Sequence, residues 1–362
     1  IFMRILQLID SLQVGGAERM AVNYANALAN QVPFSGLVTS RKEGALKSHL
    51  HENVPFLCLH KKYAIDVKAI LKLRTFCKNE SITWIHAHGT SYFTAFLLKL
   101  IYPKIKVIWH EHAGARSAEK AIRNKALWFC VKFFNGIIVV NHELENWCKS
   151  VLQFHQVLYL PNFTTINTKE KATTSLKGMH SKRILYLANL RHPKNHKLLV
   201  EVALKLRKNH PEWSFHFVGK DLNDDYTFEL KDLIKKNKVE NTVYIYGLKD
   251  DVDHIIAQAN IGVIASSSEG LPVALLEYGL HKKAVVATRV GEIPKIISND
   301  INGFIVPSNE PDLFYNALVK LIENNELIMK FGLALHQIIA QNHSEKAVVS
   351  KYMNWIKKDL KC

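Results

Sequence analysis

Short apolar runs alternate with segments of helical periodicity along almost the whole chain of 362 residues. The run MRILQLID at 3–10 is followed by the glycine loop SLQVGGAER, and apolar residues at helical spacing follow in RMAVNYANALANQ. Strand, glycine loop and helix in this order form the opening of a nucleotide-binding fold. Further alternation of this kind predicts a parallel sheet with helices on both of its faces.

The alternation runs through two blocks, separated by the polar stretch TTINTKEKATTSLKGMHS at 164–181. We therefore predict two doubly wound, Rossmann-like α/β domains, 1–165 and 182–342, joined by a linker at 166–181 and facing each other across a cleft. A helix at about 343–362 is expected to pack back on the first domain. The expected strands lie at 34–40, 82–88, 106–112, 136–141, 157–162, 183–189, 214–220, 242–247, 261–267, 284–289 and 303–307, with helices at 66–79, 91–101, 118–133, 195–209, 225–237, 250–258, after Pro272 and from 311 onward.

Charge and cysteine content narrow the class of protein. The formal net charge is +16, and residues 1–165 carry 20 basic and 10 acidic side chains. Such a field favours a polyanion, either an anionic membrane or a phosphorylated substrate, although a solvated lysine-rich surface explains it equally well. We find no RNA-binding motif, recognition helix or zinc site, so nucleic acid is not expected as a partner. The five cysteines are widely spaced, and no signal peptide is found before the first strand, so we expect a cytoplasmic protein. Met3 is expected to be its natural start.

The stretch SSSEGLPVALLEYG at 266–279 suggests a ligand. It joins a predicted strand to a helix that is expected to begin at Pro272, and exposed N–H groups at a helix start favour a phosphate. Glu269 and Glu277 would repel a diphosphate unless they accept hydrogen bonds from hydroxyl groups on either side of it. A nucleotide sugar offers such hydroxyls on its sugar and its ribose. The alternative is that both acids are simply solvated.

The motifs together resemble a known family. The stretch SSSEGLPVALLEYGLHKKAVVATRVGEIPKII, NGFIVP after it, VGGAER at 14–19, LPNF at 160–163 and LANLRHPKNHKLLVEVA at 187–203 occur in the order found in retaining glycosyltransferases of family 4. The resemblance covers nearly the whole chain and implies the GT-B fold, with two Rossmann-like domains. It departs from the family at Asn189, where an arginine is usual, and at Lys295, where an acid is usual.

The resemblance implies roles for individual residues. Glu277 would bind the donor ribose, Glu269 the transferred sugar, and Lys194 the diphosphate that leaves. His112, or as a second choice His110, would touch the donor sugar from the first domain, whereas His86 and His88 are expected to be structural. The catalytic set is then Glu269, Lys194 and His112; the acceptor side is Gly15, Gly16 and His112; and the donor site is Gly16, Asn189, Arg191, Lys194, Gly247, Leu248, Glu269, Gly270, Leu271, Pro272, Val273 and Glu277.

The family also implies the reaction. We expect transfer of a sugar from a nucleotide sugar, a UDP-sugar by preference, with retention at the anomeric carbon and without a metal or another cofactor. The basic and aromatic stretch at 116–133 suggests contact with an anionic membrane, although a packing helix with a basic face is as good an explanation. We therefore expect a glycan acceptor, lipid-linked, in polysaccharide or glycoprotein assembly on the cytoplasmic face of the inner membrane. The alternative function is a sugar-nucleotide epimerase of the same fold.

Overall fold

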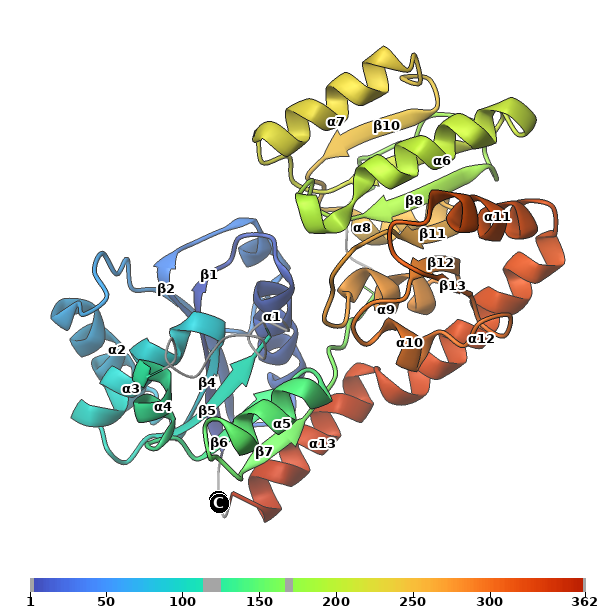
Figure 1. The fold of residues 1–362 in the computed structure, drawn as a ribbon. Coiled ribbons are helices and arrows are strands. Elements are labelled where there is room, and N and C mark those ends of the chain that lie inside the picture. Colours follow the sequence, from blue (N-terminus) through green and yellow to red (C-terminus); the bar gives the residue numbers. More distant parts are fainter. Residues whose placement is uncertain (1–2, 113–124, 167–171, 361–362) are drawn as a thin grey trace. The chain divides into compact units, whose positions relative to one another are not determined.

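The computed structural model describes residues 3–112, 125–166 and 172–360. The chain divides into two compact units (Figure 1). Unit 1 comprises the chain up to Phe163 together with the segment from Glu345 onward, and unit 2 comprises Thr164–Ser344. Among the described residues, none of the helices combines the length and apolar character that crossing a bilayer requires.

Unit 1 is built on a seven-stranded sheet with the order β3-β2-β1-β4-β5-β6-β7, in which every pairing is parallel. Strand β3 and helix α5 were not among the elements predicted from the sequence. The strands are β1 (Arg4–Ser11), β2 (Phe34–Lys42), β3 (Phe56–Cys58), β4 (Trp84–His88), β5 (Lys106–Glu111), β6 (Gly136–Val139) and β7 (Val157–Tyr159), and the helices are α1 (Gly16–Leu28), η1 (Ala45–His49), α2 (Val67–Asn79), η2 (Gly89–Ser91), α3 (Tyr92–Ile101), α4 (Lys125–Val131), α5 (His142–Ser150) and α13 (Glu345–Lys358).

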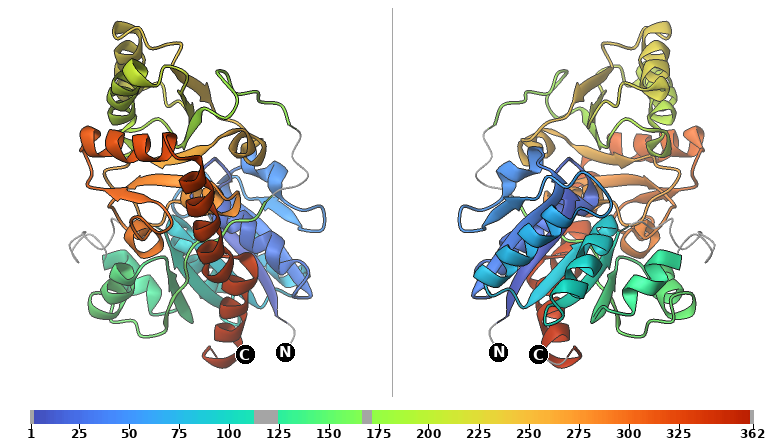
Figure 2. Two further views of the ribbon diagram at one scale, coloured as in Figure 1. Left: turned by 90° about the vertical axis from the view of Figure 1, so that its right-hand side faces the viewer. Right: turned by 90° about the vertical axis from the view of Figure 1, so that its left-hand side faces the viewer.

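Helix α13 completes unit 1 although it comes from the far end of the chain. Figure 2 shows this red helix alongside the strands of the first sheet, and it contacts α1. Its buried residues Val348, Tyr352 and Trp355 share one apolar core with Met20 and Trp84. Gly136 lies so close to it that a Cβ atom there would come within 2.4 Å of the Trp355 ring.

Unit 2 has a six-stranded parallel sheet with the order β10-β9-β8-β11-β12-β13. Two doubly wound parallel sheets are therefore present, as the sequence predicted. The strands are β8 (Arg183–Leu187), β9 (Ser214–Val218), β10 (Val243–Gly247), β11 (Ile261–Ile264), β12 (Ala284–Thr288) and β13 (Phe304–Val306), and the helices are η5 (His192–Lys194), α6 (His196–Asn209), α7 (Asp225–Lys236), α8 (Val252–Gln258), α9 (Val273–Leu280), α10 (Ile293–Ile296), α11 (Pro311–Ile322) and α12 (Asn325–Asn342).

The described end of the expected linker packs on unit 2. The backbone N–H groups of Thr173 and Thr174 donate to one carboxylate oxygen of Asp251, at 2.8 and 2.6 Å, and Leu176 is buried in the core of unit 2. Asp251 is the N-cap residue of α8, but its side chain makes no capping bond to that helix. Its pKa is held below the usual range by these hydrogen bonds, which outweigh burial.

Candidate active site

The strand order of unit 2 reverses between β8 and β11, which are neighbours in the sheet. Ligands of open α/β sheets bind beyond the carboxyl ends of the strands at such a reversal. The loop after β8 leads into η5, which ends at Lys194, and the loop after β11 carries Ser266 and Glu269. Lys194 and Glu269 are 75 residues apart in the sequence, yet the fold places them at the same reversal point.

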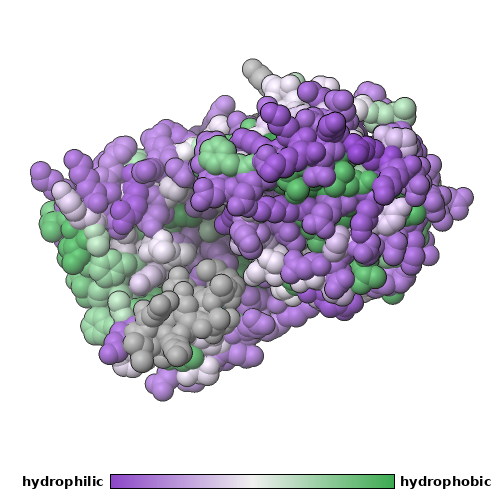
Figure 3. All heavy atoms as spheres, turned by 45° about the horizontal axis from the view of Figure 1, so that its top comes forward, coloured by the Kyte–Doolittle hydropathy of each residue, from purple (hydrophilic) through white to green (hydrophobic). Residues whose placement is uncertain are grey.

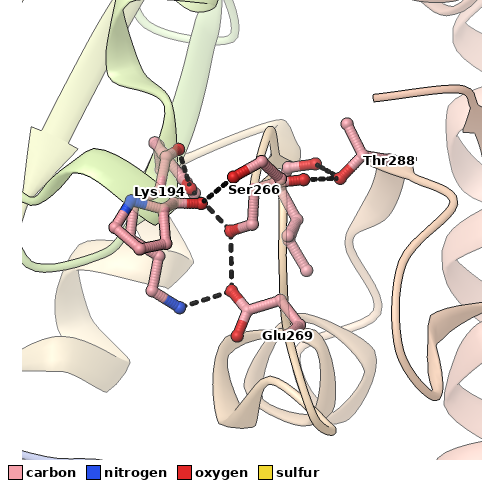
Figure 4. Close-up of polar contacts among 8 residues, drawn as sticks. Lys194, Ser266, Glu269 and Thr288 are labelled. Atoms are coloured by element: carbon pink, nitrogen blue, oxygen red, sulfur yellow. Dashed lines mark hydrogen bonds and ion pairs between the residues drawn. The ribbon is translucent and has the colours of Figure 1, made fainter. Parts of the chain in front are cut away.

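Lys194 and Glu269 form an ion pair (Figure 4). Figure 4 shows the ammonium group of Lys194 and the hydroxyl group of Ser266 converging on one oxygen of Glu269. The Ser266 Oγ donates to Glu269 Oε1 at 2.6 Å. The two charged side chains keep 16% and 11% of their surface exposed, so a ligand can reach both of them.

A second set of hydrogen bonds holds this pair from behind. The buried Tyr186 hydroxyl donates to the carbonyl oxygen of Lys194 at 2.6 Å and lies 3.1 Å from Ser266 Oγ. Thr288, at the end of β12, donates its hydroxyl to the carbonyl oxygen of Ser266 at 2.6 Å. Burial raises the pKa of Tyr186 well above its ordinary value, so its hydroxyl remains a hydrogen-bond donor at any physiological pH.

Helix α9 begins next to this pair and contains Glu277. Its N-cap is Pro272 and its first helical residue is Val273, so it begins one residue later than predicted and ends at Leu280. Glu277 is partly buried, and Leu271 and Pro272 are buried. A Cβ atom added to Gly270 would meet no heavy atom within 4 Å, so the backbone there is open to a ligand.

Gly291 supports the same loop, a role that the sequence did not suggest. Its φ of +55° is in the left-handed region, and a Cβ atom there would lie 2.2 Å from the carbonyl oxygen of Glu269 and 2.4 Å from that of Gly270. The backbone N–H of Glu292 donates to the carbonyl oxygen of Gly270 at 3.0 Å. Lys295, where the family usually has an acid, forms an ion pair at 2.8 Å with the buried Glu292.

The other predicted donor residues lie at or just after the carboxyl ends of β8 and β10. Asn189 accepts a hydrogen bond at 2.9 Å from the backbone N–H of Lys220, so part of its side chain already holds two loops together. Arg191 is exposed, and among the described residues its side chain forms no hydrogen bond or ion pair that would fix it beside Lys194. Gly247 adopts a φ of +70° at the end of β10, and Leu248 after it is 39% exposed.

In unit 1, four histidines gather at the ends of β4 and β5. His86 Nε2 lies 3.2 Å from His110 Nδ1, and His88 Nδ1 lies 3.0 Å from His112 Nε2. The rings stack, with centroids of His110 and His112 3.9 Å apart. His86 and His88 therefore belong to the same cluster as the predicted site residue His112. Within it, His86, His88 and His110 are at most 1% exposed.

Hydrogen bonding indicates which nitrogens carry protons. His88 Nε2 lies 2.9 Å from Gln7 Oε1, which can only accept, so this nitrogen is the donor. His88 Nδ1 must then accept from His112 Nε2, which leaves His112 Nδ1 as an acceptor. Burial lowers the pKa of His112 to about 3, so the ring stays neutral. Ring nitrogens of His86, His88 and His110 lie within 4.8 Å of one another, so these three residues could hold a metal ion.

The glycine loop of unit 1 ends at the start of α1. Gly15 is the N-cap residue, with an extended backbone, and a Cβ atom on it would meet the carboxylate of Glu18 at 2.3 Å. A Cβ atom on Gly16 would meet no heavy atom within 4 Å, so this helix start is open. At the end of β1, Asp10 accepts hydrogen bonds from Ser40 and Thr90, a group that the sequence did not single out.

Several supporting residues were missed because their types are ordinary in strands. Tyr186 and Thr288 occupy strand positions where a core residue is the default interpretation, and only pairing between distant strands brings them to Ser266. Gly291 was noted only as part of a motif. A glycine in the short loop between a strand and a helix was the available signal.

This arrangement is suited to an anionic leaving group. A lysine ammonium, an open glycine backbone and the start of α9 lie together, and each of them favours negative charge. Glu269 keeps the ammonium group in place in the absence of a ligand. An incoming diphosphate would share Lys194 with Glu269, whose carboxylate could then accept hydrogen bonds from sugar hydroxyls.

Comparison with known proteins identifies the family. Residues 14–166 match the family model described as Glycosyltransferase Family 4, and residues 167–334 match the model described as Glycosyl transferases group 1. The chain is 23% identical over 327 residues to an uncharacterized glycosyltransferase of Haemophilus influenzae, covering 88% of this chain and 90% of the relative. It is 22% identical over 344 residues, or 87% of this chain and 86% of the relative, to the UDP-Gal:alpha-D-GlcNAc-diphosphoundecaprenol alpha-1,3-galactosyltransferase of Escherichia coli.

Comparison with solved structures supports the fold. The structure is similar to that of Anabaena Alr3699/HepE in complex with UDP and glucose, with a TM-score of 0.82 and 16% identity over 98% of this chain and 99% of that one. The two family models together span residues 14–334, which include the second sheet, every strand of the first sheet except β1, and the Lys194–Glu269 pair. The chain therefore belongs to the family 4, group 1 glycosyltransferases of the GT-B fold.

Proposed function

We propose that the protein transfers a sugar from a UDP-sugar to a hydroxyl group of a lipid-linked glycan, with retention of configuration and without a metal ion. The observation that carries this proposal is the Lys194–Glu269 pair beside the open backbone of Gly270. One cation and one carboxylate at a strand-order reversal fit a ligand that has both a diphosphate and hydroxyl groups.

Two of the similar proteins support UDP as the nucleotide part of the donor. The name of the Escherichia coli relative specifies UDP-Gal as its donor, and the Anabaena structure contains UDP and glucose. In this chain, Gly247 and Leu248 are the residues proposed to meet the base, and Glu277 the residue proposed to accept hydrogen bonds from the ribose hydroxyls. Asn189 and Arg191 are proposed to border the phosphates.

The proposed reaction occurs on one face of the donor sugar. The bond between the anomeric carbon and the β-phosphate oxygen breaks, and Lys194 stabilises the charge that develops on the departing diphosphate. The acceptor oxygen bonds to the anomeric carbon from the same side, and its proton passes to the departing phosphate oxygen. Glu269 holds sugar hydroxyls, while His112 from unit 1 contacts the donor sugar. The α linkage in the name of the Escherichia coli relative is in keeping with retention, because UDP-galactose is itself an α-glycoside.

The acceptor proposal rests on the same relative and on charge. That relative's name specifies a diphosphoundecaprenol substrate, which is a lipid-linked sugar. A net charge of +16 favours an anionic lipid phosphate and the membrane that holds it. Gly15 and Gly16, at the open start of α1, are proposed to let the acceptor approach the backbone. Nucleotide sugars are made in the cytoplasm, so the proposed location is the cytoplasmic face of the inner membrane.

The decisive experiment is an incubation of the enzyme with a panel of UDP-sugars, with and without sugar-diphosphate-lipid acceptors. UDP release that depends on the acceptor, with an α-linked product by NMR, is the expected result. Conversion of one UDP-sugar into another without acceptor would instead establish the epimerase alternative. Addition of EDTA should leave the rate unchanged, and a loss that Mg²⁺ or Zn²⁺ restores would contradict metal independence.

A further inference from the structure

The outer surface of α2, α3 and α4 in unit 1 carries large apolar side chains that the fold leaves exposed. We call them the apolar face, and they are 38% to 52% exposed. Leucine, isoleucine and aromatic side chains at this level of exposure on adjacent helices are uncommon unless the surface has a partner. The residues of the apolar face are Leu71, Leu100, Ile101, Trp128, Phe129 and Phe133.

The apolar face is continuous. Helix α3 contacts both α2 and α4. The ring of Phe96 on α3 lies 5.8 Å from Phe129 and 5.3 Å from Phe133 on the α4 side, and Arg74 on α2 donates to the carbonyl oxygen of Ile101 at 3.1 Å. Figure 3 shows a group of apolar side chains at the left edge of unit 1, the side on which Figure 1 has α2 and α3.

Basic side chains are numerous on the segments that carry the apolar face, although Lys61 is buried and Lys72 and Lys99 donate to backbone carbonyl oxygens. Residues 61–80, 92–106 and 125–134 contain eleven lysines and arginines and two acids, Asp66 and Glu80. Both acids already have local partners, since Asp66 caps α2 and Glu80 pairs with Arg4. The ammonium group of Lys132 lies 3.3 Å from the centre of the Trp128 ring, so positive charge borders the aromatic end of the face.

This composition distinguishes between two kinds of partner. Protein interfaces are enriched in aromatic residues but depleted of lysine. Surfaces that bind anionic bilayers combine Trp, Phe and Leu with lysine and arginine, because the apolar side chains enter the interface while the cations meet lipid phosphates. Eleven basic residues against two acids match the second kind.

We propose that the apolar face docks on the surface of an anionic phospholipid bilayer, with Leu100 and Phe129 entering the headgroup region. The first half of the predicted basic stretch, 116–124, lies outside the described residues, so the face is described on α2 and α3 and at 125–133. Docking would hold the enzyme where a lipid-linked acceptor lies. That use rests on the proposed function, whereas docking itself needs neither donor nor acceptor.

The test is flotation of the purified protein with vesicles of phosphatidylethanolamine and phosphatidylglycerol, and with vesicles of phosphatidylcholine alone. The wild-type protein should float with the anionic vesicles only. The double variant Leu100→Ser/Phe129→Ser should lose at least about tenfold in vesicle affinity, because two apolar side chains no longer enter the interface. Lys68→Glu/Lys104→Glu should lose about tenfold as well, and less at high salt. Leu333→Ser, at a leucine of α12 that is 52% exposed, is the matched control and should bind like wild type.

Two outcomes would overturn the proposal. The first is equal flotation of Leu100→Ser/Phe129→Ser and wild type. The second is a wild-type dimer that only this variant converts to a monomer, since the face would then bind a second copy. Transfer to a water-soluble acceptor analogue keeps the two proposals apart. If the variant keeps that transfer but loses flotation, both stand. If wild type floats but transfers no sugar, only the proposed function fails.

Discussion

The two units handle polar side chains at the ends of their strands in opposite ways. In unit 1, burial keeps the four clustered histidines neutral, and their nitrogens bond to one another. In unit 2, Lys194 and Glu269 keep their charges by pairing, and both remain partly exposed. The same fold thus provides a buried neutral cluster in one unit and a charged pair in the other. The charged pair, and not the histidine cluster, offers a cation to a diphosphate.

The largest effect is expected from acid, which should lower the stability of the protein through the histidine cluster. The folded chain keeps His86, His88, His110 and His112 neutral, whereas the unfolded chain protonates them below about pH 6.5, so the unfolded state binds more protons. The free energy of unfolding should therefore fall as pH drops below about 6.5, by up to ~5 kcal/mol per pH unit for four groups. Urea titrations between pH 7 and pH 5 measure this slope.

A single variant sharpens that result. His86→Asn should reduce the slope by about one proton, or ~1.4 kcal/mol per pH unit. His180→Asn, which removes an exposed imidazole, is the control and should leave the slope as it is. A stability that does not change between pH 7 and pH 5 would show that the cluster is not neutral in the folded protein.

Removal of the cation in unit 2 should mainly lower turnover. Lys194→Ala takes away the charge that stabilises the departing diphosphate, so kcat should fall about 100- to 1000-fold. Steady-state release of UDP gives kcat and KM separately. The control is Lys197, three residues after Lys194, which forms an exposed ion pair with Glu229. Lys197→Ala should keep full turnover. Equal rates for both variants would remove Lys194 from the reaction.

The loop of the charged pair depends on two glycines in different ways. Gly291→Ala should destabilise unit 2 by about 2 to 4 kcal/mol, because the new methyl group strains a left-handed backbone and meets two carbonyl oxygens. Gly270→Ala has open space around it and should unfold like wild type, but should raise the donor KM if a phosphate approaches that backbone. Thermal unfolding followed by donor titration distinguishes the two. A Gly291→Ala protein of wild-type stability would show that the loop adjusts freely.

The smallest effect is expected at Glu277. Glu277→Ala should raise the donor KM about tenfold with little change in kcat, because hydrogen bonds to a ribose are equally strong before and during the reaction. Glu326→Ala, at an exposed acid of α12, is the control. A fall in kcat as large as that of Lys194→Ala would move Glu277 from donor binding into the chemistry.

The alternating pattern predicted the two parallel sheets because buried strands and amphipathic helices are local features. The three-residue strand β3 and the nine-residue helix α5 escaped prediction, although strands and helices of similar length elsewhere did not. In the site, the acid pair and Lys194 were accessible through spacing and family resemblance. The contacts of Tyr186, Thr288 and Gly291 were not, because they depend on which strands become neighbours, and no short window of sequence contains that information.

The return of the chain to unit 1 through α13 bears on the order in which the protein can form during synthesis. Residues 164–344 are continuous, and Thr164 and Ser344 pair in an isolated bridge where the chain enters and leaves unit 2. Unit 2 can therefore fold as soon as it emerges from the ribosome. Unit 1, although its first 163 residues are made earlier, keeps Trp84 and Met20 without their helical cover until Glu345–Lys358 appears. The half of the enzyme that is translated first is thus the half that finishes last, and it is the one that would need a chaperone in the interval.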